Sequence, residues 1–329
     1  MPERATGARW VLPYIDQPLA FWETIAERYG SSVREVYFPL PFDVIASGEP
    51  PQPSAHMQDF LKHAPLPRAV LLNPITLPGP VEAVAPRIID VVRRLIGEYG
   101  LSGATVANLT LGRRVREAFP GLNLSVSCLM QISRPNQVPM LDGVFDALVP
   151  CNSVMRDLRA LRALKAAFPG SLRLLVNEGC LPGCPFRVQH FQEMCMNKHF
   201  PRSLCQELLV QHPWMRLTGG WVLPQHLHLF DGVYDDLKLG GRVTLSNPER
   251  YLRVLDAYIR RTPMRPDEIG CGPGTVLQPI EISEAFYAQT LLCDRDCAHC
   301  RICRDYYRTA TQTLVEEIAR RASGAAAAE

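Results

Sequence analysis

Short apolar runs that alternate with helical patterns are the feature that most limits how this chain can fold. Apolar residues recur at helical spacing over 86–98, 157–168 and 248–260. Strands that alternate with helices indicate βαβ units and a parallel sheet. Seven or eight such units over about 250 residues fit a TIM-like (β/α)8 barrel, the α/β fold that we predict. We expect its strands near Trp10–Ile15, Val33–Phe38, Ala69–Leu72, Thr105–Ala107, Leu124–Ser127, Ala147–Val149, Leu172–Val176 and Gly232–Leu239.

The character of the chain changes after residue 262, where a stretch rich in Pro and Gly leads to a cluster of cysteines and a last helix near 301–322. We therefore expect a barrel over 1–262 and a cysteine-rich C-terminal extension over 263–329. The stretch between Cys184 and Trp221 has no clean periodicity. Long insertions of this kind are usually functional, so we predict an inserted cysteine loop at 180–220, with loops or short helices over the barrel mouth.

Composition narrows the class of partner. Lys and Arg number 35 and Asp and Glu number 33, a net charge of +2, which gives no general attraction for polynucleotides. A small-molecule or peptide substrate is therefore favoured over nucleic acid. No apolar run reaches the ~18 residues of a membrane span, and no signal-peptide core is present, so we expect a cytoplasmic protein. RNA binding stays open if a surface stripe forms from Arg113, Arg114 and Arg116, or from Arg156, Arg159 and Arg162.

The chain has eleven cysteines, an odd number that favours reduced thiolates binding metal over disulfides. A first group, Cys180, Cys184 and Cys195, follows the seventh expected strand directly, at the face of a barrel where active sites collect. Pro182–Gly183 supplies a tight turn between the first two. This group could hold iron and sulfur, and zinc is the rival if His190 or His199 completes a Cys3His set.

A second group has the sequence CDRDCAHCRIC, with Cys293, Cys297, Cys300 and Cys303. This run is a specific metal signal, and ligation by sulfur alone suits zinc or an iron–sulfur cube. Its first three cysteines have the spacing of radical S-adenosylmethionine enzymes, but those enzymes carry the triplet after the first strand of the barrel rather than after the last.

The other cysteines have less distinctive surroundings. Cys271 could complete one of the two metal-binding sets. Cys128 and Cys151 lie at the ends of expected strands, and we expect both to be packed barrel residues because unpaired cysteine is often buried. The sequence does not decide the role of Cys205.

Several segments resemble the collagenase-like peptidase family U thirty-two. They are ANLTLGRRVREAFPGLNLSVSCLMQI, FDALVPCN, LVNEGC and YDDLKLGGRVTLSNPERYLRVLDAYIRR, and the resemblance covers residues 100–262. It implies a TIM-like barrel that binds one [4Fe-4S] cluster. Several relatives are oxygen-independent hydroxylation factors acting in ubiquinone synthesis or on transfer or ribosomal RNA, with prephenate as the proposed oxygen donor.

This chain departs from the family pattern in three places. The first cysteine gap is shorter, Gly240 replaces an acidic residue, and the fourth cysteine before Lys238 is missing. Cys205 and Cys271 are the nearest substitutes for that cysteine. The peptidase reaction itself is disfavoured, because the chain has neither a G-x-S-x-G nor an H-E-x-x-H motif.

Five residues are candidates for catalysis at the barrel mouth. Arg187 and Arg242 could clamp a carboxylate or phosphate, although Arg242 could equally form an ordinary ion pair. Glu178 could act as a general base or hold the cysteine loop through backbone N–H groups. His190 could be a hydrogen-bonding residue or a metal ligand, and Lys238 belongs to the family-like segment.

Taken together, the sequence predicts an oxygen-sensitive iron–sulfur oxidoreductase with one [4Fe-4S] cluster or two, modifying a biosynthetic small molecule or peptide, with oxygen-independent hydroxylation as one form. An electron donor and a partner subunit are expected. The alternatives are a hydroxylation factor acting on tRNA or rRNA, and a non-catalytic partner subunit that carries electrons or binds zinc.

Overall fold

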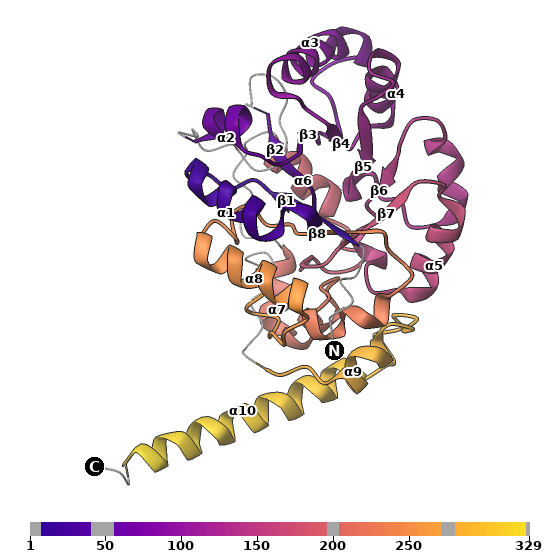
Figure 1. Cartoon of the computed structure of the whole chain (residues 1–329). Helices are drawn as coiled ribbons and strands as arrows, with labels where there is room; N and C mark the ends of the chain where they lie inside the picture. The colour runs from indigo at the N-terminus through magenta and orange to yellow at the C-terminus, as the bar shows by residue number, and fades with distance from the viewer. Residues whose placement is uncertain (1–7, 41–55, 196–203, 271–279, 327–329) are drawn as a thin grey trace.

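The computed structural model describes residues 8–40, 56–195, 204–270 and 280–326, and eight parallel strands close into a barrel at its centre (Figure 1). Each strand pairs with the next in the chain, and β8 pairs with β1, placing Lys238 opposite Val11. The predicted TIM-like (β/α)8 fold is confirmed. The strands are β1 Arg9–Pro13, β2 Val33–Pro39, β3 Arg68–Leu72, β4 Gly103–Val106, β5 Asn123–Val126, β6 Ala147–Leu148, β7 Ser171–Leu175 and β8 Asp236–Lys238.

Helices cover the outside of the barrel, and several begin at a capping side chain. The side chain at the start of each of these helices accepts a hydrogen bond from the backbone N–H three residues later. This satisfies a donor that the first helical turn leaves free. The capping residues are Asn108, Asp157 and Asn247. Between β5 and β6 the chain forms only short 3-10 turns, including Pro135–Leu141 with Pro139 inside it, because proline lacks the N–H that an α-helix needs. The covering helices are α1 Leu19–Tyr29, α2 Met57–His63, α3 Val81–Tyr99, α4 Leu109–Ala118, α5 Leu158–Ala167 and α8 Pro248–Arg260.

Short helices lie in the described parts of the long connection between β7 and β8. The eighth strand is shorter than the expected 232–239, because a 3-10 turn ends at Phe230 and Gly232 adopts a left-handed φ of 85° before the strand begins. The connection contains α6 Arg187–Cys195, α7 Leu204–Gln211 and the 3-10 helices Pro213–Thr218 and Pro224–Phe230.

The C-terminal extension packs against the barrel before its last helix leaves the body of the molecule. It contains α9 Glu284–Thr290 and α10 Ile302–Ala326, and α10 projects away from the barrel (Figure 1). The backbone N–H of Leu158 donates to Leu291 O at 3.1 Å, which joins the start of α5 to the extension. No described helix combines the length and apolar character that crossing a membrane would require.

The barrel interior carries charge near its amino end. Alternate strand residues face outward into one large apolar core shared with the helices, while Val11, Tyr37, Ala69 and Leu71 form a separate cluster. In β7, Arg173 has no exposed side-chain surface, and its Nη1 lies 2.7 Å from Glu35 Oε1. Such a pair is tolerated in a barrel only because both charges are neutralised locally.

Candidate functional site

The turn after β7 carries a buried ion pair at the carboxyl end of the barrel. Oε1 of Glu178 accepts the backbone N–H of Cys180 at 2.9 Å, and its Oε2 lies 3.1 Å from Nη2 of Arg187, the first residue of α6. Burial acts to raise the pKa of Glu178, but the guanidinium and the N–H bring it below its ordinary value. The ion pair therefore fixes the cysteine-containing turn to the start of α6.

Arg187 has hydrogen-bond donors that no described residue accepts. It is 4% exposed, and its Nε and Nη1 have no hydrogen-bond partner among the described residues. Buried N–H groups without partners are uncommon and costly. Because a guanidinium binds carboxylates and phosphates through two parallel hydrogen bonds, Arg187 is equipped to hold an anionic group.

Lys238 brings a second buried cation to the same end of the barrel. It ends β8, is 8% exposed, and its Nζ lies 4.2 Å from the centre of the Tyr37 ring. Burial lowers the pKa of Lys238 to a net value of about 8, although the nearby Cys128 acts to raise it. Sγ of Cys128 also lies 3.8 Å from Nη2 of Arg187, so Cys128 contacts the charged group as well as the barrel core.

The other two catalytic candidates lie nearby but are less closely tied to this group. His190 lies one turn along α6, and burial lowers its pKa, with a further lowering contribution from the charge of Arg187. Arg242 is half-buried after β8, and its charge contributes to lowering the pKa of Lys238. The structure thus brings Glu178, Arg187 and Lys238 together.

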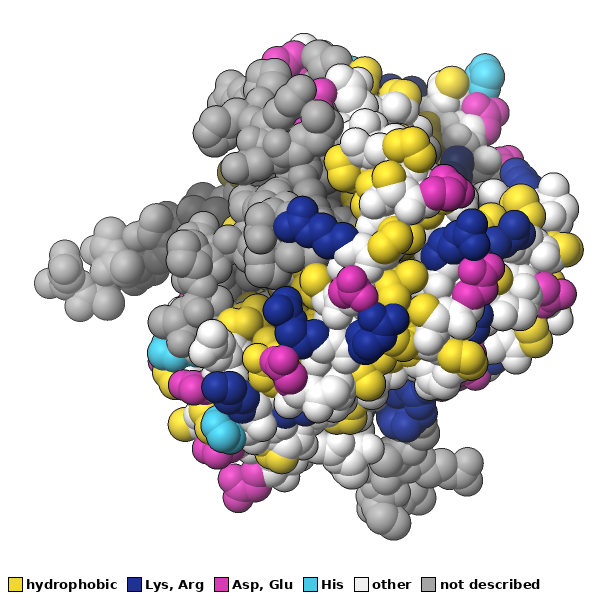
Figure 2. All heavy atoms as spheres, turned by 90° about the horizontal axis from the view of Figure 1, so that it is seen from above, with side chains coloured by type: hydrophobic (Ala, Val, Ile, Leu, Met, Phe, Trp, Pro, Cys, Tyr) yellow, Lys and Arg dark blue, Asp and Glu magenta, His cyan; other side chains and the backbone are white. Residues whose placement is uncertain are grey.

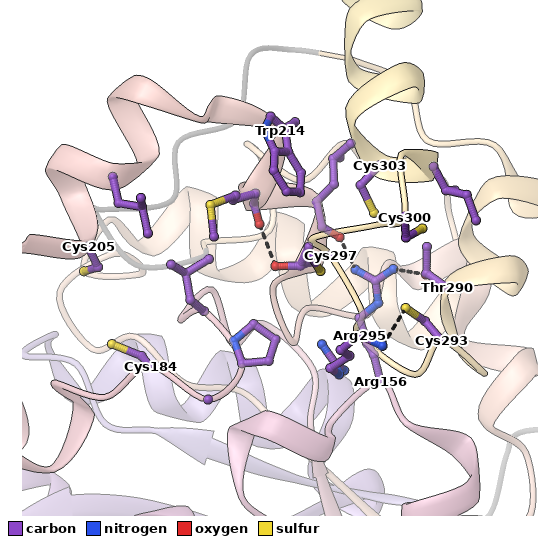
Figure 3. A pocket seen from close by; sticks show the side chains of 18 of the residues that line it. Arg156, Cys184, Cys205, Trp214, Thr290, Cys293, Arg295, Cys297, Cys300 and Cys303 are labelled. Carbon is purple, nitrogen blue, oxygen red and sulfur yellow. Dashed lines mark hydrogen bonds between the residues drawn. The ribbon is translucent and has the colours of Figure 1, made fainter.

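Six cysteines line one cavity of about 350 Å³ between the β7–β8 connection and the C-terminal extension. The rest of its wall is largely apolar and includes Leu181, Leu208 and Trp214. Figure 3 shows two of these cysteines on the side of the connection and four on the side of the extension. They are Cys184, Cys205, Cys293, Cys297, Cys300 and Cys303.

This arrangement regroups the cysteines of the sequence. Cys184, expected in a set with Cys180 and Cys195, faces the cavity that it shares with the C-terminal run, and Cys205 joins it there. Cys180 instead lies beside Glu178. Cys271 and the side chain of Cys195 lie outside the described part of the chain, so their assignment as ligands stays a prediction. Within the described ranges no three His, Cys, Asp or Glu side chains lie close enough together to hold a metal ion.

The cavity nevertheless has features that suit thiolate ligands. The backbone N–H of Arg295, which has a left-handed φ of 66°, donates to Sγ of Cys293 at 3.2 Å, and N–H groups directed at sulfur tune iron–sulfur clusters. Burial works against the thiolate form of Cys303, because it raises the pKa of this thiol to about 11. Metal binding there would have to release a proton.

The sequence did not show that one arginine is buried in the wall of this cavity. Arg156, considered above for a surface stripe with Arg159 and Arg162, is 2% exposed and lines the cysteine cavity, so it contributes no charge to the surface. Arg116 is tied by an ion pair to Asp146. Figure 2 shows basic side chains interspersed with acidic and apolar ones on the face in view, without a continuous basic stripe on its described part.

Comparison with known proteins supports the resemblance seen in the sequence. No family model matches the chain. The uncharacterized protease MJ1657 of Methanocaldococcus jannaschii is 24% identical over 210 residues, which cover 56% of this chain and 59% of that protein. The chain therefore spans less than two thirds of the length of this curated relative.

Solved structures agree on the fold. The U32 peptidase Mk0906 matches 73% of this chain and 94% of its own, with a TM-score of 0.51 and 14% identity. The spore cortex-lytic enzyme SleL of Bacillus megaterium matches 80% of this chain and 76% of its own, with a TM-score of only 0.43 and 8% identity, too low to carry an argument. The chain is therefore similar in sequence to the archaeal protein and shares the (β/α)8 barrel fold with the U32 peptidase Mk0906.

Proposed function

We propose that this protein is an iron–sulfur redox enzyme that modifies a small anionic molecule at the barrel mouth. The observation that carries the proposal is the gathering of six cysteines, from two segments far apart in the chain, on one cavity. Apart from Cys303, none of these six cysteines is among the described side chains that pack against the main apolar core. Cys293, Cys297, Cys300 and Cys303 would supply a full sulfur set, with Cys184 and Cys205 opposite.

An iron–sulfur cluster, when bound, supplies one-electron transfer. The protein would bind and orient the substrate with its own charged groups. Arg187 and Lys238 are two buried cations beside one buried carboxylate, that of Glu178, so an anionic substrate group would balance the excess charge. Oxygen-independent hydroxylation is one reaction of this kind, and the substrate would approach from the carboxyl ends of the strands, where TIM barrels perform their chemistry.

Metal analysis tests this proposal. Protein purified without oxygen is expected to be brown and to hold at least about four iron and four sulfide per chain, with the Mössbauer spectrum of a cubane cluster. Cys297→Ala and Cys300→Ala should each lose iron. Cys151→Ala is the matched control, because this buried thiol contacts Gln131 at 3.1 Å and is not among the cavity-lining residues described.

Two results would overturn the proposal. Colourless protein, or protein that contains zinc alone, would favour the zinc-binding or non-catalytic alternative. Full iron in both Cys297→Ala and Cys300→Ala would show that the cavity is not the cluster site.

Peptide hydrolysis is the second candidate, because the curated relative is named a protease and the solved neighbour a peptidase. It is less well supported by the site, because a thiol nucleophile needs a lowered pKa and burial raises the pKa of Cys128, Cys180 and Cys303. Incubation with a fluorogenic peptide library decides between them. Cleavage by metal-free protein that persists in Cys→Ala variants of the cavity would favour the peptidase.

A further inference from the structure

Arg156 lies in the wall of the cysteine cavity and is held there from several sides. Its guanidinium carbon lies 4.5 Å from the centre of the Trp221 ring and 4.3 Å from that of the Tyr287 ring. Its Nη1 donates to the carbonyl oxygens of Leu217 at 2.8 Å and Gly219 at 3.1 Å. Such a guanidinium has little freedom to move, so its charge is fixed in space.

The charge of Arg156 has no carboxylate to balance it. No ion pair joins Arg156 to a carboxylate in the described part of the chain, and its Nε has no hydrogen-bond partner there. Nη2 donates to the hydroxyl of Thr290, which is neutral. A buried arginine keeps its proton in proteins, and an isolated buried charge is strongly unfavourable. An anion is therefore expected beside it.

The thiols of the extension are the groups placed to become that anion. Cys293 and Cys303 line the same cavity as Arg156, and both lie close enough for their charges to act on it electrostatically. Figure 3 shows Arg156 beside Cys293, with its guanidinium directed toward Thr290 at the edge of the cavity. A cluster held by four thiolates carries a net negative charge, and each added electron makes that charge larger by one.

We propose that Arg156 is a positioning residue that sets the reduction potential of the cysteine-bound cluster by supplying a fixed positive charge. This inference rests on the proposed function. Reduction takes one electron from an external one-electron donor and breaks no bond, so the cavity becomes more negative by one charge. Arg156 stabilises the reduced form more than the oxidised form, because Coulomb attraction grows with the charge of the partner.

The test is a redox titration of anaerobically purified protein with dithionite, followed by its visible and electron paramagnetic resonance spectra. Arg156→Gln is expected to shift the midpoint potential to a more negative value than that of the wild type. Arg295→Gln is the matched control, because Arg295 lines the same cavity but is half-buried. Its smaller shift should fade at high salt, whereas the shift in Arg156→Gln should persist, since salt screens exposed charges and hardly affects buried ones.

Arg156→Lys keeps the result decisive if Arg156→Gln does not fold. A buried lysine can lose its proton and an arginine cannot. The potential of Arg156→Lys should therefore fall, relative to that of the wild type, as the pH is raised toward 10. A cluster with unchanged potential in Arg156→Gln, or with a wild-type pH profile in Arg156→Lys, would overturn this inference and leave the iron–sulfur function standing. Wild-type protein without a cluster would overturn both.

Discussion

Replacing Lys238 with methionine is expected to stabilise the fold near neutral pH while removing a charge that we propose binds the substrate. Methionine has a similar length and flexibility and can fill the same space. Lys238 is buried at the end of β8 and faces the Tyr37 ring rather than a carboxylate. A buried charge that costs stability at the carboxyl end of a (β/α)8 barrel is best explained by a function that requires it.

The free energy that it costs to bury the Lys238 ammonium follows from the pKa of this group. Burial lowers the pKa of Lys238 from 10.5 to about 8. Each tenfold change in proton affinity corresponds to 1.4 kcal/mol, so keeping the ammonium in the barrel reduces the free energy of unfolding by about 3 kcal/mol at pH 7. This value already includes the favourable contacts of the ammonium, because each of them acts on the same pKa. We therefore expect Lys238→Met to gain about 3 kcal/mol at pH 7.

The gain should depend on pH in a defined direction. Below pH 8 the folded and unfolded chains both hold the proton, and the cost of burying the charge is complete. Between pH 8 and 10.5 the unfolded chain still binds a proton that the folded chain has released, so wild-type stability rises with pH relative to the variant. The advantage of Lys238→Met should shrink across this window and be lost above it.

Urea denaturation followed by circular dichroism at pH 7, 9 and 10.5 measures these differences. Lys165→Met is the control, because Lys165 forms a partly exposed ion pair with Asp235, and its loss should cost no more than about 1 kcal/mol. Destabilisation of Lys238→Met at pH 7, or a gain that is the same at all three pH values, would show that the ammonium is not held at a cost and would refute the reasoning.

Three further substitutions test contacts at the site and at the opposite end of the barrel. Glu178→Gln leaves the arginine at the start of α6 without its buried counter-charge, so we expect a loss of about 3–5 kcal/mol in urea denaturation; unchanged stability would contradict the role of this pair in holding the turn. Glu35→Gln should cost less than this by calorimetry, because it removes one of the two carboxylates that pair with Arg173 inside the barrel and leaves Asp236, and a wild-type Tm would argue against a charged interior. Gly170→Ala should lower the Tm sharply, since a Cβ there would clash with the carbonyl oxygen of Asp146; soluble protein of normal Tm would rule out this close approach.

The barrel was predictable because its signals are local. Short β-branched runs and helical spacing lie within windows of a few residues, and seven of the expected strands lie within about two residues of those observed. The eighth was overextended by four residues at its start, because Val233 and Tyr234 look strand-like while Gly232 turns the chain just before them. An apolar run does not reveal whether it pairs with a neighbour.

The site was only partly predictable because its contacts join distant segments. The resemblance and the expected mouth of the barrel located Glu178 and Lys238, and the position of Cys180 after the seventh strand was visible from spacing. The sequence did not show that Cys184 and Cys303 line the same cavity, because 118 intervening residues separate them. Arg156 looked like one of several exposed arginines on a helix, and only the packed extension reveals that it is buried.

The shared cavity changes how the two cysteine groups are best understood. If they formed two independent metal sites, removing the extension would leave the first site intact and the barrel mouth unaffected. The extension is instead joined to the start of α5 through Leu158 and through the hydrogen bond from Arg156 to Thr290. Cys184 lies only four residues beyond Cys180, whose N–H is held by the carboxylate of Glu178. A charge placed in the cysteine cavity would therefore lie close to the turn that also fixes Arg187, and in the enzyme that we propose this would link the electron-carrying end to the substrate-binding end.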